Sequence, residues 1–181
     1  MDESHVISSI REGDTDAFAE IVEHYQMPII RYLYRLTGDY AVAEDLGQDT
    51  FFQAYRGILK TNSDLSLKTW LYRIATNNAR QFHRRRRLRR FIPFTDLGKS
   101  DIPDPQVLSD CVEERITIEN ALLEVPHGQK TCMVLHFVEG LKYREIGEII
   151  GISEEAVRKR VARGSHEFRK AYRSLSGEES R

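Results

Sequence analysis

The sequence has little of what would tie its 181 residues to a membrane or to a disulfide framework. It lacks any run of about 18 consecutive apolar residues, the length that a membrane span needs. Its start, Met-Asp-Glu-Ser, does not resemble a signal peptide. Two cysteines, Cys111 and Cys132, offer no disulfide framework and fit a reducing compartment. We therefore expect a cytoplasmic protein.

Signatures of catalysis are also lacking. No Gly-rich phosphate loop, nucleophile elbow or paired metal-ligand motif is found, and the six histidines are scattered. Cys132 and His136 lie four residues apart on an expected helix, but no second ligand pair is near, so core packing is the better interpretation. We expect no enzymatic activity, no metal site and no cofactor.

What the sequence does have is an uneven distribution of charge, hidden by its net charge of −1. When the chain is divided after residues 56, 92 and 141, the successive blocks carry net charges of −7, +9, −6 and +3. Basic blocks with helical patterning are typical of nucleic-acid contact. The acidic blocks would repel phosphates, so they are expected to face another partner.

Helical periodicity predicts an all-α fold. Apolar residues recur at spacings of three and four from Phe18 to Leu36, with Asp14 as the expected N-cap and Gly38 as the stop. Pro28 predicts a kink in this helix, or two helices in tandem. Later helices are expected from Asp39, from Ser66 or Thr69 into the arginine run, around residues 116–123, and at about 129–139, 143–150 and 154–172. Residues 57–67 are predicted to form a loop.

Helical patterning disappears between residues 91 and 110, which contain three prolines and four aspartates. Such a composition is typical of an extended acidic linker. The sequence therefore predicts two small helical domains joined by a flexible acidic linker. The expected limits are 1–92 for the first domain, 93–111 for the linker, 112–176 for the second domain and 177–181 for a tail.

The second domain contains the pattern of a helix-turn-helix at residues 141–170. An amphipathic helix meets a Gly-Ile-Ser turn, and a Ser-capped helix follows. Val157 and Val161 are expected to face the first helix of the pair. The opposite face suits a DNA major groove, where Arg can read guanine and Glu can accept from cytosine. The residues expected to contact duplex DNA on or beside this face are Glu155, Arg158, Lys159, Arg160 and Arg163. The alternative is a solvated basic helix.

The other basic block, residues 69–90, interleaves aromatic, amide and arginine groups. On a helix, Trp70, Ile74 and Phe82 are predicted to lie largely inward, and Tyr72 and Thr76 toward the other side. Such a face can stack on exposed bases and hold phosphates. Taken alone, an arginine run is more often a solvated surface than a reader of sequence.

These motifs together resemble the extracytoplasmic-function (ECF) sigma factors of bacterial RNA polymerase. The segments AEDLGQDTF and WLYRIATN, the basic run after them and the C-terminal helix-turn-helix follow the family's order and spacing over nearly the whole chain. The resemblance implies sigma domain two for residues 1–92 and sigma domain four for 112–176. It implies promoter-specific transcription initiation in response to envelope or environmental stress, with core RNA polymerase, promoter DNA and an anti-sigma factor as partners.

The resemblance also assigns roles to residues. One exposed helical face would dock on the polymerase clamp helices: Asp45, Gln48, Asp49 and Phe52. A specificity loop and the helix after it would bind the melted minus-ten element: Lys60, Asn62, Ser63, Asp64, Lys68, Trp70, Tyr72, Arg73, Thr76, Asn77, Arg80, Arg84, Arg85, Arg86 and Arg87. The recognition helix from Glu154 would read the minus-thirty-five element as a duplex, and the linker would thread the polymerase cleft.

Several residues depart from the family's pattern. Lys142 stands where Ser or Thr is common, Gly147 where Ala is common, and Glu154 and Glu155 where small or hydroxyl residues are frequent. The rival interpretation is a stand-alone helix-turn-helix regulator, which would leave AEDLGQDTF and WLYRIATN without a role. Co-purification with core polymerase separates the two.

Overall fold

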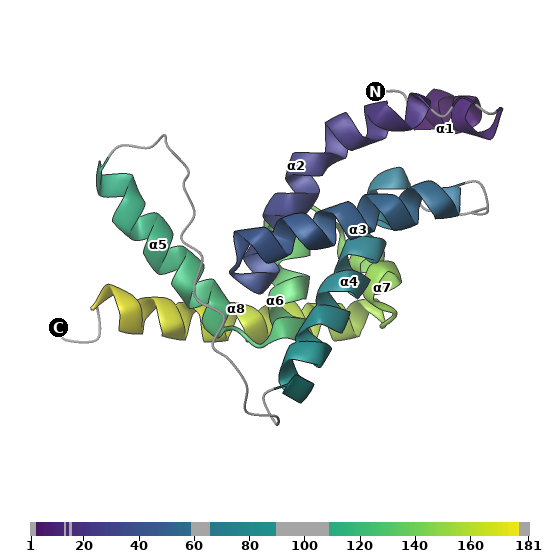
Figure 1. The fold of residues 1–181 in the computed structure, drawn as a ribbon. Coiled ribbons are helices and arrows are strands. Elements are labelled where there is room, and N and C mark those ends of the chain that lie inside the picture. Colours follow the sequence, from purple (N-terminus) through teal and green to yellow (C-terminus); the bar gives the residue numbers. More distant parts are fainter. Residues whose placement is uncertain (1–2, 13, 15, 59–65, 90–108, 178–181) are drawn as a thin grey trace. The chain divides into compact units, whose positions relative to one another are not determined.

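The computed structural model describes residues 3–12, 14, 16–58, 66–89 and 109–177, and every secondary-structure element within these ranges is a helix. The helices form two compact units (Figure 1). The first contains α1 (Glu3–Arg11), α2 (Ala17–Thr37), α3 (Tyr40–Ile58) and α4 (Leu67–Arg89), apart from the segment Arg35–Asp39, which clusters with the second. The second contains α5 (Ser109–Glu124), α6 (His127–Met133), η1 (Val134–Val138), α7 (Tyr143–Ile150) and α8 (Glu154–Ser176). The predicted all-α class with two helical domains is confirmed.

Local signals set the helix ends of the first unit as predicted. The carboxylate of Asp14 accepts hydrogen bonds from the backbone N–H groups of Asp16 and Ala17, at 3.0 and 3.2 Å. Helix α2 ends before Gly38, whose φ of 73° is one that glycine adopts without strain. Ser66 caps α4, because its Oγ accepts from the N–H of Thr69 at 3.2 Å.

Helix α2 runs through Pro28 as one helix, so the prediction of two helices in tandem was wrong. Pro28 is exposed, whereas the residues on the inner face, before and after it, are buried. That buried stripe includes Ile21, Ile29 and Leu33, each with no exposed surface. Packing of a continuous apolar face therefore holds the helix together where proline removes one backbone hydrogen bond.

Polar side chains join α3 to α4 inside the first unit. The Asn78 side-chain amide donates to Thr50 Oγ1 at 3.1 Å and accepts from the amide of Gln53 at 3.0 Å. Thr50 Oγ1 in turn donates to the Leu46 carbonyl at 2.7 Å. Thr50 and Asn78 are buried, and these bonds meet the requirement that buried polar groups be paired.

In the helix-turn-helix of the second unit, α7 has the predicted bounds and α8 begins at Glu154 as predicted, but α8 continues to Ser176, past the predicted end at about residue 172. Helix α7 ends at Gly151, whose φ is 77°, and the Ser153 hydroxyl caps α8 by accepting from the N–H of Ala156 at 3.2 Å. The Gly147 carbonyl accepts from the N–H groups of both Gly151 and Ile152. This approach is so close that a Cβ on Gly147 would lie 2.7 Å from the Ile152 carbonyl oxygen.

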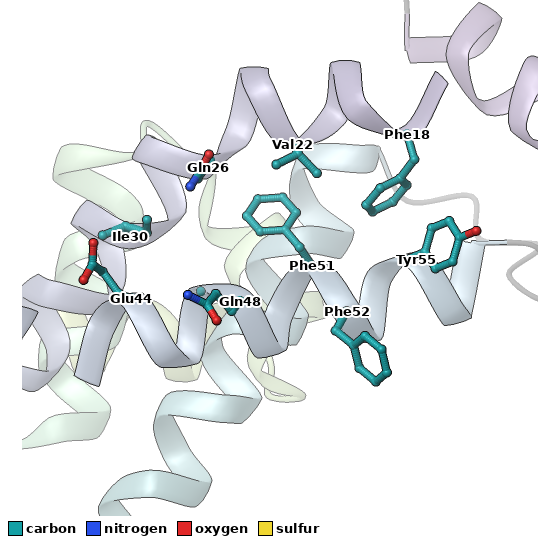
Figure 2. Close-up of a pocket in the computed structure, with 10 residues that line it drawn as sticks. Phe18, Val22, Gln26, Ile30, Glu44, Gln48, Phe51, Phe52 and Tyr55 are labelled. Carbon is teal, nitrogen blue, oxygen red and sulfur yellow. The ribbon is translucent and has the colours of Figure 1, made fainter. Parts of the chain in front are cut away.

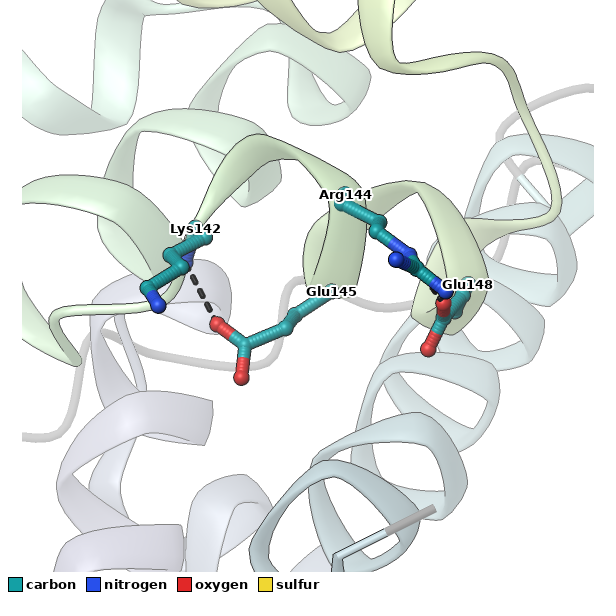
Figure 3. Close-up of polar contacts among 4 residues, drawn as sticks. All are labelled: Lys142, Arg144, Glu145 and Glu148. Atoms are coloured by element: carbon teal, nitrogen blue, oxygen red, sulfur yellow. Dashed lines mark hydrogen bonds and ion pairs between the residues drawn. The ribbon is translucent and has the colours of Figure 1, made fainter. Parts of the chain in front are cut away.

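The start of α7 shows how the chain manages with Lys142 at the position where the sequences that it resembles commonly have a Ser or Thr cap (Figure 3). A lysine ammonium has no acceptor, so Lys142 cannot receive a backbone N–H. Instead, the Glu145 carboxylate reaches back and accepts from the Lys142 backbone N–H at 2.7 Å. Half of a capping box therefore serves this helix.

Lys130 is a buried cation of α6, with 4% of its surface exposed. Its ammonium donates to the Leu123 carbonyl near the end of α5, at 3.2 Å. Burial lowers the pKa of Lys130 from 10.5 to about 8, against the opposing attraction of Glu124. Because the unfolded chain then binds a proton that the folded chain has released, stability should rise as the pH increases from about 8 toward 10.5.

We expect this rise to be smaller in the variant Lys130→Met, which has no ammonium to titrate. Urea unfolding of the two proteins between pH 7.5 and 10 measures it. Burial raises the pKa of the Cys132 thiol, which gives an opposing slope, but that slope is common to both proteins and cancels in their difference. Parallel pH profiles would show that Lys130 does not carry the effect.

Candidate nucleic-acid and protein interfaces

An acidic and aromatic face lies on α3, where the sequence predicts it. The structure brings its four members onto one exposed side of the helix: Asp45, Gln48, Asp49 and Phe52. The opposite side holds Ala43, Thr50 and Ala54, none of which has exposed surface. Phe52 is 61% exposed, which is unusual for a phenylalanine in a folded domain. Core packing therefore does not account for this side chain.

A groove of about 380 Å³ between α2 and α3 adjoins this face (Figure 2). Figure 2 shows Phe51 directed toward α2 and Phe52 directed away from it. Phe18 of α2 contacts Tyr55 edge to face, with ring centroids 5.2 Å apart. The lining residues are Phe18, Val22, Gln26, Ile30, Glu44, Gly47, Gln48, Phe51, Phe52 and Tyr55.

The α2 side of this groove is what sequence reasoning missed. Phe18 and Val22 belong to the apolar stripe of α2 and were assigned to the core, yet Val22 is only half-buried. A groove arises from the separation of two helices, and helical periodicity carries no information on that separation. The polar residue Gln26 beside the apolar stripe is only a weak indication of a groove at this place.

The basic surface of the first unit lies on α4. Its exposed members are Arg73, Arg80, Arg84, Arg85, Arg86 and Arg87, and its half-exposed members are Lys68, Trp70 and Asn77. Arg80 donates to the Asn77 side-chain oxygen at 3.1 Å. The predicted loop residues lie outside the described residues: Lys60, Asn62, Ser63 and Asp64.

The predicted outward placement of Tyr72 and Thr76 was wrong, because both are core residues, with 1% and 4% of their surface exposed. The Tyr32 hydroxyl lies 2.7 Å from Thr76 Oγ1, which donates to the Tyr72 carbonyl at 2.6 Å. The rings of Tyr32 and Tyr72 pack with centroids 5.1 Å apart. Trp70, Ile74 and Phe82, predicted to lie largely inward, are all half-buried.

The outer face of α8 has the predicted composition, with Glu155, Arg158 and Lys159 all exposed and Val157 and Val161 buried on the opposite side. Two ion pairs run along it. Arg158 lies 3.3 Å from a Glu154 carboxylate oxygen, and Lys159 lies 2.7 Å from one of Glu155. Since these pairs are exposed and one turn apart, each contributes only a few tenths of a kcal/mol, roughly 0.3–0.5. A phosphate or base can therefore displace them.

The structure separates the two flanking arginines of this helix. Arg163 is exposed, but Arg160 is half-buried and lies near the buried Cys132 of α6, where burial raises the thiol pKa and the Arg160 charge opposes that rise. One Arg160 nitrogen lies 3.7 Å from the place that a Cβ on Gly128 would occupy. Arg160 therefore packs two helices of the unit together and is not grouped with the outer face.

No helix of the described segments combines the length and apolar character that crossing a bilayer requires. The described residues also contain no group of three or more His, Cys, Asp and Glu side chains placed to hold a metal ion. His136 Nδ1 lies 3.0 Å from the Leu141 carbonyl oxygen.

Comparison with known proteins shows which family the chain is similar to. Residues 21–89 match the family described as sigma-70 region 2, and residues 115–165 match sigma-70, region 4. The chain is 33% identical to the ECF RNA polymerase sigma factor SigW of Bacillus subtilis, over 93% of this chain and 96% of that protein. It is 29% identical to the RNA polymerase sigma-H factor of Pseudomonas aeruginosa, over 96% and 95%.

Two solved structures share the fold. One is the structure of CnrH in complex with the cytosolic domain of CnrY, with a TM-score of 0.70, 20% identity, and coverage of 93% of this chain and 95% of that one. The other is the sigma factor RpoE in complex with the anti-sigma factor NepR from Bartonella quintana, with a TM-score of 0.68, 21% identity, and coverage of 88% and 96%.

Proposed function

The chain belongs to the extracytoplasmic-function sigma factors of RNA polymerase, and on that premise we propose how its surfaces act in promoter-specific transcription initiation. It acts in the cytoplasm as a non-catalytic specificity subunit of core RNA polymerase. Residues 1–92 form sigma domain two, 93–111 the linker, and 112–176 sigma domain four. Helix α5 begins at Ser109, so the start of the last domain is better placed there.

The α3 face docks on core polymerase. An exposed phenylalanine among acidic and amide side chains supports this role, because interface centres are enriched in aromatic residues whereas their rims are polar. The adjoining groove between α2 and α3 extends the apolar surface that a partner helix can cover. The residues proposed for docking are Asp45, Gln48, Asp49 and Phe52.

Helix α4 and the segment before it bind the melted minus-ten element. Arginines along the exposed side hold phosphates, and Trp70 has an exposed portion on which a base can stack. The proposal covers Lys60, Asn62, Ser63, Asp64, Lys68, Trp70, Arg73, Asn77, Arg80, Arg84, Arg85, Arg86 and Arg87. Tyr72 and Thr76 are left out because they are buried.

Helix α8 reads the minus-thirty-five element as a duplex, with Glu155, Arg158 and Lys159 on the base-facing side and Arg163 near the backbone. A capped helix with an exposed polar face, held by a buried face against α7, is the arrangement that the major groove admits. A protein inhibitor of the anti-sigma class covers these surfaces until a stress signal arrives. The likeness in fold to a sigma factor solved with an anti-sigma factor supports this partner.

The observation that carries the proposal is the 33% identity to a sigma factor over 93% of the chain. Run-off transcription with core polymerase and genomic fragments tests it, and we expect discrete promoter-specific transcripts that depend on the added chain. Sequence-specific nanomolar binding of the free chain to promoter duplex, without stimulation of polymerase, would instead establish a stand-alone regulator.

Substitutions along α8 should have distinct effects if the helix reads duplex DNA. Arg158→Ala should cost about 1–3 kcal/mol and relax the preference at one base pair. Arg163→Ala should weaken all promoters alike and flatten the salt dependence, because a phosphate contact is lost. Glu155→Ala should change base preference more than affinity. Transcription from a library randomised across the minus-thirty-five element measures all three, and an unchanged preferred sequence in both Arg158→Ala and Glu155→Ala would refute base reading by this face.

A further inference from the structure

Three side chains from three successive elements of the second unit lie next to one another at the outer face of α8. The rings of His136 in η1 and Tyr143 in α7 have centroids 4.4 Å apart, at an interplanar angle of 37°. The Arg158 guanidinium carbon of α8 lies over the Tyr143 ring, 5.7 Å from the ring centre. Both aromatic residues are half-buried, whereas 65% of the Arg158 side chain is exposed.

Arg158 is therefore restrained from two directions. Glu154 pairs with one guanidinium nitrogen at 3.3 Å from the preceding turn of α8, and the Tyr143 ring faces the guanidinium from α7. The neighbouring Lys159 forms an ion pair with Glu155, and within the described residues no aromatic ring faces its ammonium group. Arg158 thus differs from the other exposed cations of this face in having an aromatic support.

This difference bears on reading bases. Arginine recognises guanine through two parallel hydrogen bonds, which need the planar guanidinium in one orientation. An unrestrained arginine loses rotamer freedom on binding, and a side chain already held in the bound orientation loses less. A ring face behind the guanidinium restrains its plane while leaving its remaining N–H groups free to donate.

We propose that Tyr143 is a positioning residue for promoter recognition: it holds Arg158 in the orientation that reads a base of the minus-thirty-five element, and His136 packs against the Tyr143 ring. The proposal rests on the function proposed for α8. It makes α7, which is usually regarded as the scaffold of a helix-turn-helix, a contributor to sequence preference.

The test uses the full chain with core polymerase and a library randomised across the minus-thirty-five element. Tyr143→Leu keeps apolar bulk but removes the ring, and Tyr143→Phe keeps the ring but removes the hydroxyl. We expect Tyr143→Leu to reduce discrimination about two- to fivefold at the one base pair that Arg158→Ala affects, and nowhere else. Tyr143→Phe should keep the original preference.

The outcomes separate the two proposals. If Arg158→Ala leaves every base preference unchanged, base reading by Arg158 fails. If Arg158→Ala relaxes one position and Tyr143→Leu does not, or if the Leu and Phe variants behave alike, the positioning role of Tyr143 is refuted. In the double variant Tyr143→Leu/Arg158→Ala, Tyr143→Leu should add no further loss of discrimination.

A measurement on the unmodified protein covers the case in which Tyr143→Leu does not fold. Nitrogen relaxation of the arginine side chains by NMR reports the mobility of each guanidinium. We expect the Arg158 signal to be less mobile than that of Arg163 and to show a ring-current shift from Tyr143. Equal mobility with no such shift would overturn the proposal.

Discussion

The variants Asp45→Arg and Phe52→Ala are each expected to lower the affinity for core RNA polymerase by more than about tenfold. Both side chains lie on the exposed face of α3, and Phe52 is 61% exposed. Reversing a charge at a complementary interface adds repulsion, and removing a central aromatic anchor takes away a large buried area. Gel filtration of each variant mixed with core polymerase, followed by a titration, measures the loss.

Glu23→Arg is the matched control, because it makes the same change of charge at an exposed position of α2 outside the docking face and the groove. It should bind core polymerase as the unmodified chain does. All three substitutions are at exposed positions and should change the free energy of unfolding within about 0.5 kcal/mol. Co-elution of both α3 variants with core polymerase at the unmodified affinity would remove the docking assignment.

Gly147→Ala is expected to destabilise the second unit by about 1–3 kcal/mol. A Cβ there would lie 2.7 Å from the Ile152 carbonyl oxygen and 3.7 Å from the Glu154 nitrogen, both on the backbone. Because backbone atoms cannot swing aside as a flexible side chain can, the turn between α7 and α8 must shift. Thermal unfolding should show a Tm at least about 4 °C lower.

Gly128→Ala provides a control within the same unit, because this substitution should raise the Tm instead of lowering it. Gly128 is exposed near the start of α6, and a Cβ there would meet only an Arg160 nitrogen at an ordinary 3.7 Å. Alanine favours a helix over glycine by up to about 1 kcal/mol, so the Tm should rise slightly. If Gly147→Ala were as stable as Gly128→Ala, the close backbone approach would not limit this turn.

The sequence alone was a good guide wherever structure depends on residues close together in the chain. Asp14 and Ser153 cap the helices that they were predicted to cap, and Ser66 is the one of the two candidates, Ser66 and Thr69, that caps α4. A cap needs only its own side chain and the next few N–H groups. Gly38 and Gly151 end helices for an equally local reason, a positive φ.

Prediction failed where a distant residue decides the outcome. Tyr72 and Thr76 look like polar, outward residues of α4, yet Tyr32, at least forty positions earlier in the chain, pairs with the Thr76 hydroxyl and packs on the Tyr72 ring. Periodicity does not reveal such a partner. The buried side of α4 was therefore predicted to lie on a different side of the helix from the one that is buried in the structure. Arg160, predicted to flank the outer face of α8, is half-buried for the same reason, since the neighbouring Cys132 comes from another helix.

The hydrogen bonds that join Gln53, Thr50 and Asn78 bear on how this protein can be redesigned. Anyone who transplants α4 from another sigma factor, to change promoter choice, brings in a different residue at position 78. An apolar residue there would leave the buried Thr50 hydroxyl without its donor and Gln53 without its acceptor. A successful graft must therefore carry positions 50 and 53 of α3 together with α4, although neither position belongs to the transplanted helix.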